Sequence, residues 1–600
     1  RNEGALHLTT TSVADGGVNF LTQGMFNAVV SEGKFAVRGV LAYNDDAGFI
    51  DNEATGEDDW NSFNQLSGRL MATWAPSDTV RIDASYIKQD LDRNGNNQVD
   101  GRFDPDFDDP SQLTWRMADA ENVTDIGNLT MTFDLGFAEL MSSTSYLDKS
   151  QRQNVEFGEL FVFDAVSVEE WSLMEYMGLP IEFGDLSSQV TWRPVIATAD
   201  AQSVFQEFRL VSRDTGTFDW IVGAYYADVT SGFDTDVYLE GMEDAVNAVE
   251  PGIGTMLYPG DLYVSFPGSQ DATELAVYGE LGIDFSEVWK LTVGGRYFDF
   301  ESETYSSSTS WGWTDEIGPL PFEESDFMPK VSLAYHPSND LLWYALASRG
   351  YRVGGVNEVV AQYGGDAPLT YDTDKLWNYE TGVKKTWANG KVITDVTLFY
   401  IDWSDIQLPV TFMDPSSPWG MTSAILNTGS AHSLGAEAFL SAELAPGLMF
   451  VTSIAWTEAE LDEDTMPIMN GETGEFVVVP AGTQLPGTPK WNTSTMLQYY
   501  FNSAKLGFPF IELSHTYKGE VTDELSVQGI IPSWNLFNLR FGATVAKDLQ
   551  VSLAVNNLLD DRQPMARWYP YMGSFVPEVQ PEMWFITRPR SISLTLQKNF

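Results

Sequence analysis

Apolar and polar residues alternate with a period of two in many short segments of this chain. Residues 80–86 read VRIDASY, in which valine, isoleucine, alanine and tyrosine alternate with arginine, aspartate and serine. The same alternation recurs at 128–135, 537–543 and 550–556. A period of two places one set of side chains on each face of a β-sheet. The sequence therefore predicts an all-β protein.

Two kinds of connection separate these predicted strands. Short turns rich in Gly, Pro, Asn, Asp and Ser lie at 31–34, 75–78, 134–137, 214–217, 285–288, 336–340, 387–390, 445–447, 501–504 and 545–548. The other connections are long and polar, for example 89–112 and 302–326. Short turns at one end and long loops at the other are typical of outer-membrane barrels. We expect a transmembrane antiparallel β-barrel of about 22 strands with short periplasmic turns and long extracellular loops.

The chain ends in an alternating strand, RPRSISLTLQKNF, whose last residue is Phe600. Lipid cannot satisfy an open sheet edge, so the first and last strands must pair. We expect 5–12 (ALHLTTTS) to pair with 590–600. Lipid-facing and lumen-facing side chains should then alternate, with Ile592, Leu594, Leu596 and Phe600 toward lipid and Ser591, Ser593, Thr595, Gln597 and Asn599 toward the lumen.

Composition excludes several other classes. The mean hydropathy is −0.18, and no apolar run approaches the roughly 20 residues of a membrane-spanning helix. There are no cysteines, hence no disulfides or thiolate sites. A net charge of −53 disfavours nucleic-acid binding, which needs clustered Lys and Arg. Such acidity suits a surface in a salty, for example marine, medium, or attraction of cations.

Several stretches resemble the barrel of TonB-dependent outer-membrane receptors. They are 206–226, 275–301, 328–357 (which contains SRGYRVGGVN), 376–407, 427–444 and 555–561 (VNNLLDD). The resemblance covers nearly the whole chain. It implies a Gram-negative outer-membrane location and ligand-gated uptake of a scarce nutrient such as a ferric siderophore, another metal chelate or a glycan. Phe600 resembles the signal by which the barrel assembly machinery recognises its substrates.

The family gates its lumen with an N-terminal plug, on which the TonB complex pulls. Residues 1–30 already read as the first hairpin of the barrel, so we expect 1–600 to be barrel alone, without a plug or signal peptide. The plug is then cleaved or missing from this sequence, a separate chain, or truly absent. The alternative function is a plugless passive pore or a structural, partner-binding barrel. No catalytic constellation is visible, so we do not expect an enzyme. Outer-membrane lipid and a surface lipoprotein are further expected contacts.

One loop resembles a calcium-binding loop. In DLDRNGNNQVDG (90–101), Asp90, Asp92 and Asn94 precede Gly95, and Asp100 follows. Oxygen ligands at alternate positions before a glycine turn are half of such a motif. Gly101 stands where the motif has a bidentate glutamate. The alternative is an acidic, solvated loop; no other cofactor is expected.

Two further sets of residues are candidates for binding. Arg349 and Arg352 end a predicted strand and could meet a plug or an anion in the lumen, or simply flank glycines that let the strand bend. Exposed loop aromatics could stack on a ligand, or pack the loops against one another. These aromatics are Trp311, Trp313, Trp419, Trp568, Tyr569 and Tyr571.

Overall fold

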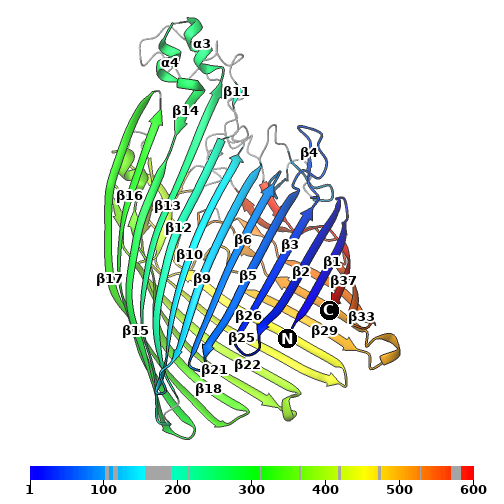
Figure 1. The fold of residues 1–600 in the computed structure, drawn as a ribbon. Helices are drawn as coiled ribbons and strands as arrows, with labels where there is room; N and C mark the ends of the chain where they lie inside the picture. The colour runs from blue at the N-terminus through cyan, green and yellow to red at the C-terminus, as the bar shows by residue number, and fades with distance from the viewer. Residues whose placement is uncertain are drawn as a thin grey trace.

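The chain forms a closed β-barrel in a computed structural model (Figure 1). The structure describes residues 1–101, 107–112, 119–155, 191–192, 195–213, 216–249, 251–310, 312–363, 366–416, 421–470, 475–526, 529–568 and 583–600. Its main sheet has 24 strands, of which β11 (Thr191–Trp192) and β14 (Leu262–Ser265) are short additions. The other 22 close the barrel, so the predicted fold and strand number are confirmed.

The barrel strands follow one another round the ring in chain order, each antiparallel to the next. They are β1 (Glu3–Val13), β2 (Val18–Ser31), β3 (Phe35–Asp46), β5 (Phe63–Ser77), β6 (Val80–Arg93), β9 (Ala120–Asp134), β10 (Ala138–Val155), β12 (Val195–Ser212), β13 (Phe218–Glu240), β15 (Gly268–Ser286), β16 (Trp289–Ser310), β17 (Trp313–Ser338), β18 (Leu341–Arg352), β21 (Asp374–Trp387), β22 (Val392–Ser404), β25 (Ser430–Ala445), β26 (Leu448–Leu461), β29 (Trp491–Tyr500), β30 (Phe510–Lys518), β33 (Trp534–Ala546), β34 (Leu549–Asn556) and β37 (Ser591–Asn599). Each predicted short turn joins two consecutive members of this ring.

The extracellular connections contain small elements of their own. Their strands are β4 (Asp51–Asn52), β7 (Val99–Asp100), β8 (Ser111–Gln112), β19 (Gly355–Val356), β20 (Thr370–Tyr371), β23 (Gln407–Met413), β24 (Met421–Asn427), β27 (Ile468–Met469), β28 (Phe476–Val477), β31 (Val521–Thr522), β32 (Ile530–Ile531), β35 (Pro564–Trp568) and β36 (Met583–Ile586). The helices are α3 (Met242–Val249), α4 (Ile253–Leu257) and α5 (Glu358–Tyr363), with a 3-10 turn at η2 (Pro259–Asp261). Two further 3-10 turns, η3 (Ala388–Gly390) and η4 (Ala504–Leu506), lie in short periplasmic turns instead. Among the described residues, no helix is long and apolar enough to cross a membrane.

The barrel closes between its two terminal strands. Ala5 of β1 pairs with Asn599 of β37, and the register continues to Val13 opposite Ser591. Inside the lumen, the Thr9 and Thr595 hydroxyls lie 2.9 Å apart. On the other face Ile592, Leu594 and Leu596 are exposed, as lipid-facing side chains of a barrel must be. The predicted closure is therefore confirmed.

Two exposed aromatics on one strand are spaced as residues at the two membrane boundaries would be. On β13, Phe218 and Tyr226 are eight residues apart on the outer face, which is about 27 Å along a strand. The usual strand tilt shortens this to about 20 Å, most of the roughly 25 Å of an outer-membrane apolar band. The Tyr226 hydroxyl donates to Asp228 at 3.3 Å, and Tyr146 donates to Asp148 at 3.2 Å. These tyrosines thus point their hydroxyls away from lipid.

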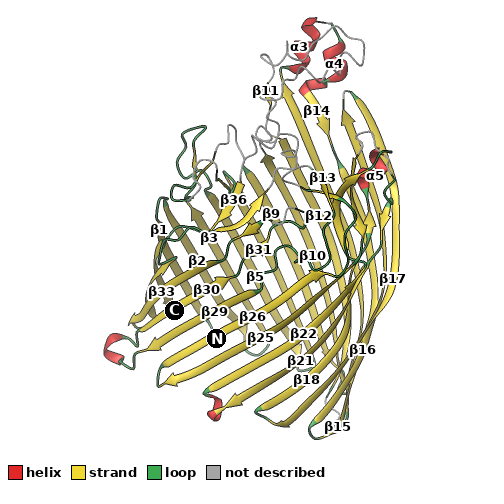
Figure 2. Cartoon of the chain, turned by 180° about the vertical axis from the view of Figure 1, so that it is seen from behind, coloured by secondary structure: helices red, strands yellow, loops and turns green. Residues whose placement is uncertain are grey.

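The extracellular rim is sloped, because the strands differ greatly in length (Figure 2). β16 and β17 have 22 and 26 residues, whereas β29 and β30 have 10 and 9. The expectation of a long loop at 302–326 was wrong, since most of this stretch continues these two tall strands. Its strand character was hidden because exposed Glu301 and Glu303 alternate with buried Ser302 and Thr304, and all four are polar.

Candidate functional site: the extracellular mouth

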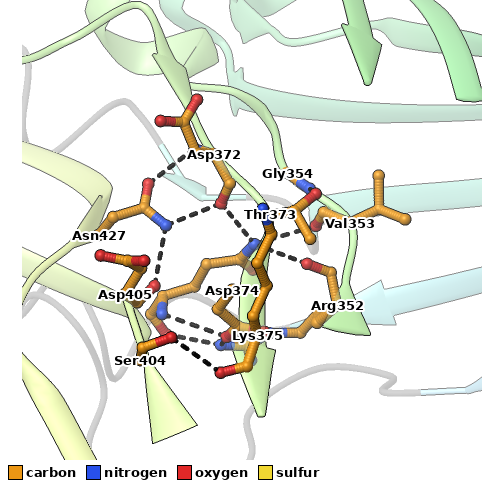
Figure 3. Close-up of polar contacts among 11 residues, drawn as sticks. Arg352, Val353, Gly354, Asp372, Thr373, Asp374, Lys375, Ser404, Asp405 and Asn427 are labelled. Atoms are coloured by element: carbon orange, nitrogen blue, oxygen red, sulfur yellow. Dashed lines mark hydrogen bonds and ion pairs between the residues drawn. The ribbon is translucent and has the colours of Figure 1, made fainter. Parts of the chain in front are cut away.

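A polar junction at the mouth joins the ends of three barrel strands (Figure 3). The Arg352 side chain, at the end of β18, donates to the Asp374 carboxylate at 3.0 Å through Nε and at 2.5 Å through Nη2. Asp374 begins β21 and is only 1% exposed. Nη2 also donates to the Gln407 carbonyl at 2.9 Å, and the guanidinium lies 5.5 Å from the Trp403 ring. A buried carboxylate is thereby held by a charge-assisted pair.

Gln407 fixes the loop that follows β18. Its buried Nε2 donates to the carbonyls of Arg352 at 3.2 Å, Val353 at 3.0 Å and Asp372 at 3.0 Å. Gly354 lies in the same crossing, where an added Cβ would come within 2.2 Å of the Tyr371 carbonyl oxygen. The glycine is therefore required by close backbone approach. These contacts hold both ends of the 353–373 loop against one side chain.

Asn427 completes the junction from the β23–β24 hairpin. Its Nδ2 donates to the carbonyls of Asp372 at 2.7 Å and Asp405 at 3.0 Å, and its Oδ1 accepts from the Asp372 backbone N–H at 2.7 Å. The Ser404 hydroxyl donates to the Lys375 carbonyl at 3.2 Å. Two extracellular loops are thus joined into one unit (Figure 3).

Further along these two loops, Asn357 and Asp414 each form several hydrogen bonds. Asn357 donates to the carbonyls of Pro368 and Ile425 at 3.0 and 2.9 Å and accepts from the Ile425 N–H at 2.8 Å. Asp414, 1% exposed, accepts from the Ser416 hydroxyl at 2.6 Å and the Thr422 hydroxyl at 3.0 Å. Hydrogen bonds, above all the one from Ser416, lower the pKa of Asp414 to about 2. Desolvation of the carboxylate opposes this shift, but its effect is smaller.

A second junction lies above the closing strands. Arg588 donates to both carboxylate oxygens of Asp46, at 2.8 and 2.7 Å, and Asn19 donates to Asp46 at 3.0 Å. The VNNLLDD stretch lies beside it: Asn557 donates to the carbonyls of Asp561 and Arg588 at 2.9 and 3.0 Å. This stretch therefore joins the two ends of the extracellular loop between β34 and β37.

The two arginines predicted from the sequence are both paired with carboxylates of the wall. Arg349 lies 3.3 Å from Asp326, which also forms an ion pair with Lys375 at 2.9 Å. Arg352 holds Asp374 as described. These pairs favour the structural interpretation of both residues. Contact with a plug or an anion stays a prediction.

The candidate calcium residues are only partly brought together. Asp90 and Asp92 lie near the extracellular end of β6, and with Glu121 of β9 their carboxylate oxygens lie within 4.8 Å of one another. Asn94 instead donates to the Ser62 hydroxyl at 2.7 Å, and Asp100 is buried in β7, which pairs with β36. Glu121 was missed because it reaches Asp92 only through the register of β6 and β9. Calcium binding stays a prediction.

Of the candidate loop aromatics, only Trp313 is fully described. It begins β17 and is 71% exposed. Trp568 ends β35, and nothing is described of its side chain. Trp311, Trp419, Tyr569 and Tyr571 lie outside the described residues. Ligand stacking by these residues stays a prediction.

Charged pairs line one side of the lumen, which sequence reasoning did not locate. Lys330 of β17 donates to Glu280 of β15 at 2.7 Å, and Lys384 of β21 pairs with Asp395 of β22 at 2.9 Å. Arg296 pairs with Glu274, Tyr278 donates to Glu207, and Tyr344 donates to Glu380 at 2.5 Å. These residues occupy alternate positions to exposed, lipid-facing neighbours such as Leu281, Val331 and Val383.

Comparison with known proteins finds one family and many related folds. A family model described as TonB dependent receptor-like, beta-barrel, matches residues 42–558. The ferric yersiniabactin uptake receptor FyuA from Yersinia pestis superposes with a TM-score of 0.75 at 16% identity, covering 100% of this chain and 80% of that one. The siderophore receptor PiuA from Acinetobacter baumannii gives 0.70 at 14%, covering 100% and 82%. The ferripyoverdine receptor of Pseudomonas aeruginosa gives 0.66 at 14%, covering 100% and 72%.

Proposed function

This chain belongs to the TonB-dependent receptor-like β-barrel family and thus to the outer membrane, and from that premise we propose that it takes up a ferric siderophore or another metal chelate. Three similar folds carry names that refer to siderophores or their ferric complexes, which supports a chelate over a glycan. The partners of such uptake are a plug in the lumen, the TonB complex acting through it, and the barrel assembly machinery. A surface lipoprotein is a further candidate partner.

The strand number is the observation that carries this proposal. Barrels of 16–18 strands leave an aqueous channel, whereas 22-stranded outer-membrane transporters enclose a plugged lumen. This barrel closes with 22 strands, so its lumen is wide enough to pass a chelate once a plug moves. Buried hydrogen bonds such as those of Gln407 join its extracellular loops. The mouth is therefore already formed before a ligand binds.

The test is uptake of iron-55 by cells that carry the full gene in a strain deleted for it. A panel of ferric chelates is supplied, with and without a protonophore and in a strain lacking TonB. We expect saturable uptake of at least one chelate that depends on the gene, on the proton gradient and on TonB. Uptake that continues without TonB, together with a steady conductance in planar bilayers, would indicate a passive pore instead.

A further inference from the structure

The lumen wall has two unlike sides. The charged wall comprises the lumen faces of β12 to β22, with the pairs Arg296–Glu274, Lys330–Glu280 and Lys384–Asp395. The seam wall comprises the lumen faces of β34, β37, β1 and β2, where the barrel closes. β17, at the middle of the charged wall, lies half-way round the ring of 22 strands from β1.

Hydroxyls and amides dominate the seam wall. Its registers place Ser552 beside Thr595 and Thr595 beside Thr9, and the hydroxyls of Thr11 and Ser593 lie 2.8 Å apart. His7, 3.2 Å from Gln23, and Glu3 at the periplasmic rim are the titratable side chains among the described lumen-facing residues of these four strands. Other members of this wall are Gln550, Asn556, Ser591 and Gln597.

The two walls suit different tasks. An ionised carboxylate can accept several hydrogen bonds, so Glu274, Glu280 and Asp395 can accept from a second domain as well as from their partners in the wall. Such charge-assisted hydrogen bonds are shorter and roughly twice as strong as neutral ones, and they can therefore hold a domain in place. Passage requires binding that is weak and repeated over several sites. A row of interchangeable hydroxyl and amide groups meets that requirement for a hydrated, oxygen-rich solute, because each contact is neutral and the next one is similar.

We propose that the transported ligand crosses the lumen along the seam wall, while the charged wall holds the gating domain. This inference rests on the proposed uptake function. It concerns a ligand that is polar and hydrogen-bonding, such as a metal chelate with exposed oxygen donors. The path runs past Thr9, Ser552 and Thr595, on the opposite side of the barrel from Lys330.

These 600 residues contain no cysteine, so a cysteine introduced into the barrel is its one thiol. Single variants Ser552→Cys and Thr595→Cys probe the seam wall. Two variants on the charged wall serve as matched controls. Thr292→Cys matches Ser552→Cys, because both residues lie three positions after the start of their strands. Thr397→Cys matches Thr595→Cys, because both hydroxyls lie within hydrogen-bonding distance of a neighbouring hydroxyl. The full-gene protein in cells is treated with a charged methanethiosulfonate reagent, and labelling is measured by mass.

We expect the seam cysteines to be labelled, and labelling to slow energised uptake by about tenfold while surface binding of the chelate stays unchanged, because a fixed charge now interrupts the row of weak sites. The control cysteines should be labelled several-fold more slowly than the seam cysteines, because the gating domain covers the charged wall. Unlabelled seam cysteines, or control cysteines labelled as fast as the seam cysteines, would overturn the inference. Loss of TonB-dependent uptake in the unmodified parent protein would instead contradict the proposed function.

Discussion

Asp46 and Arg588 are joined by two hydrogen bonds of 2.8 and 2.7 Å although 542 positions separate them in the chain. Asp46 ends β3, and Arg588 precedes the last strand, so their pair ties the two sides of the barrel closure together above the membrane. Arg588→Gln leaves the buried Asp46 carboxylate without its main partner. We expect a loss of about 2 kcal/mol of unfolding free energy, measured by urea denaturation in detergent.

Arg590→Gln is the control for that change. Arg590 pairs with Asp560 at 3.4 Å, and 44% of its side-chain surface is exposed, so the loss should stay within about 0.5 kcal/mol. Equal losses in the two variants would show that the Asp46 pair has no special role.

Gln407→Met tests the junction at the mouth. The substitution keeps the side-chain volume but leaves the carbonyls of Arg352, Val353 and Asp372 without their shared donor. We expect the local stability of 353–373 to fall by about 1–3 kcal/mol, seen as faster hydrogen exchange there. Gln202→Met, at an exposed position of β12, should leave exchange in this loop unchanged.

Asp414 should make its loop sensitive to acid. Hydrogen bonding lowers its pKa from 3.8 to about 2 in the folded protein, so the charged carboxylate stabilises the loop above pH 3.8, and this contribution disappears as the pH falls through 2. We expect hydrogen exchange of 407–427 to accelerate across that window in the parent protein but not in Asp414→Asn. A pH-independent difference between them would contradict this assignment.

Glu358 should act in the opposite direction. Burial raises its pKa above 4.5, against a hydrogen bond from Ser306 that lowers it. A raised folded-state pKa makes an ionised glutamate destabilising, so the loop loses stability as the pH rises from 4.5 through the folded value. Glu358→Gln is expected to stabilise 353–373 at pH 7 and to have no effect at pH 4, by the same exchange measurement.

Phe600 should matter more for assembly than for stability. Its backbone N–H donates to the Gly4 carbonyl at 2.8 Å and its carbonyl accepts from Gly4 at 3.3 Å, while its side chain is 73% exposed. Deletion of Phe600 should cost about 1–2 kcal/mol in the refolded barrel and should greatly reduce the assembled barrel in cells. Phe600→Trp should retain assembly. Normal assembly of the deletion variant would contradict a signal role.

Local patterns predicted the barrel well, because its strands obey a period of two and its periplasmic turns carry Gly, Asn and Asp. The 387–390 turn illustrates this: Asn389 and Gly390 have φ of 57° and 90°, conformations that these residue types favour. The pairing of β1 with β37 followed from closure alone.

The sites were harder to predict, since their members meet through strand register. Asp92 reaches Glu121, and Lys330 reaches Glu280, only when distant strands are aligned. The tall hairpin of β16 and β17 escaped detection because strand extensions outside lipid alternate in burial without alternating in hydropathy, as Ser302 and Glu303 do.

The unequal strand lengths give the mouth a direction. β17 exceeds β30 by a length that corresponds to roughly 40 Å of wall at the usual rise and tilt of barrel strands, and the two lie on different sides of the opening (Figure 2). The mouth therefore opens obliquely, toward the side of the short strands. A solute that reaches the mouth beside β29 and β30 therefore meets a lower strand wall than one that reaches it beside β16 and β17.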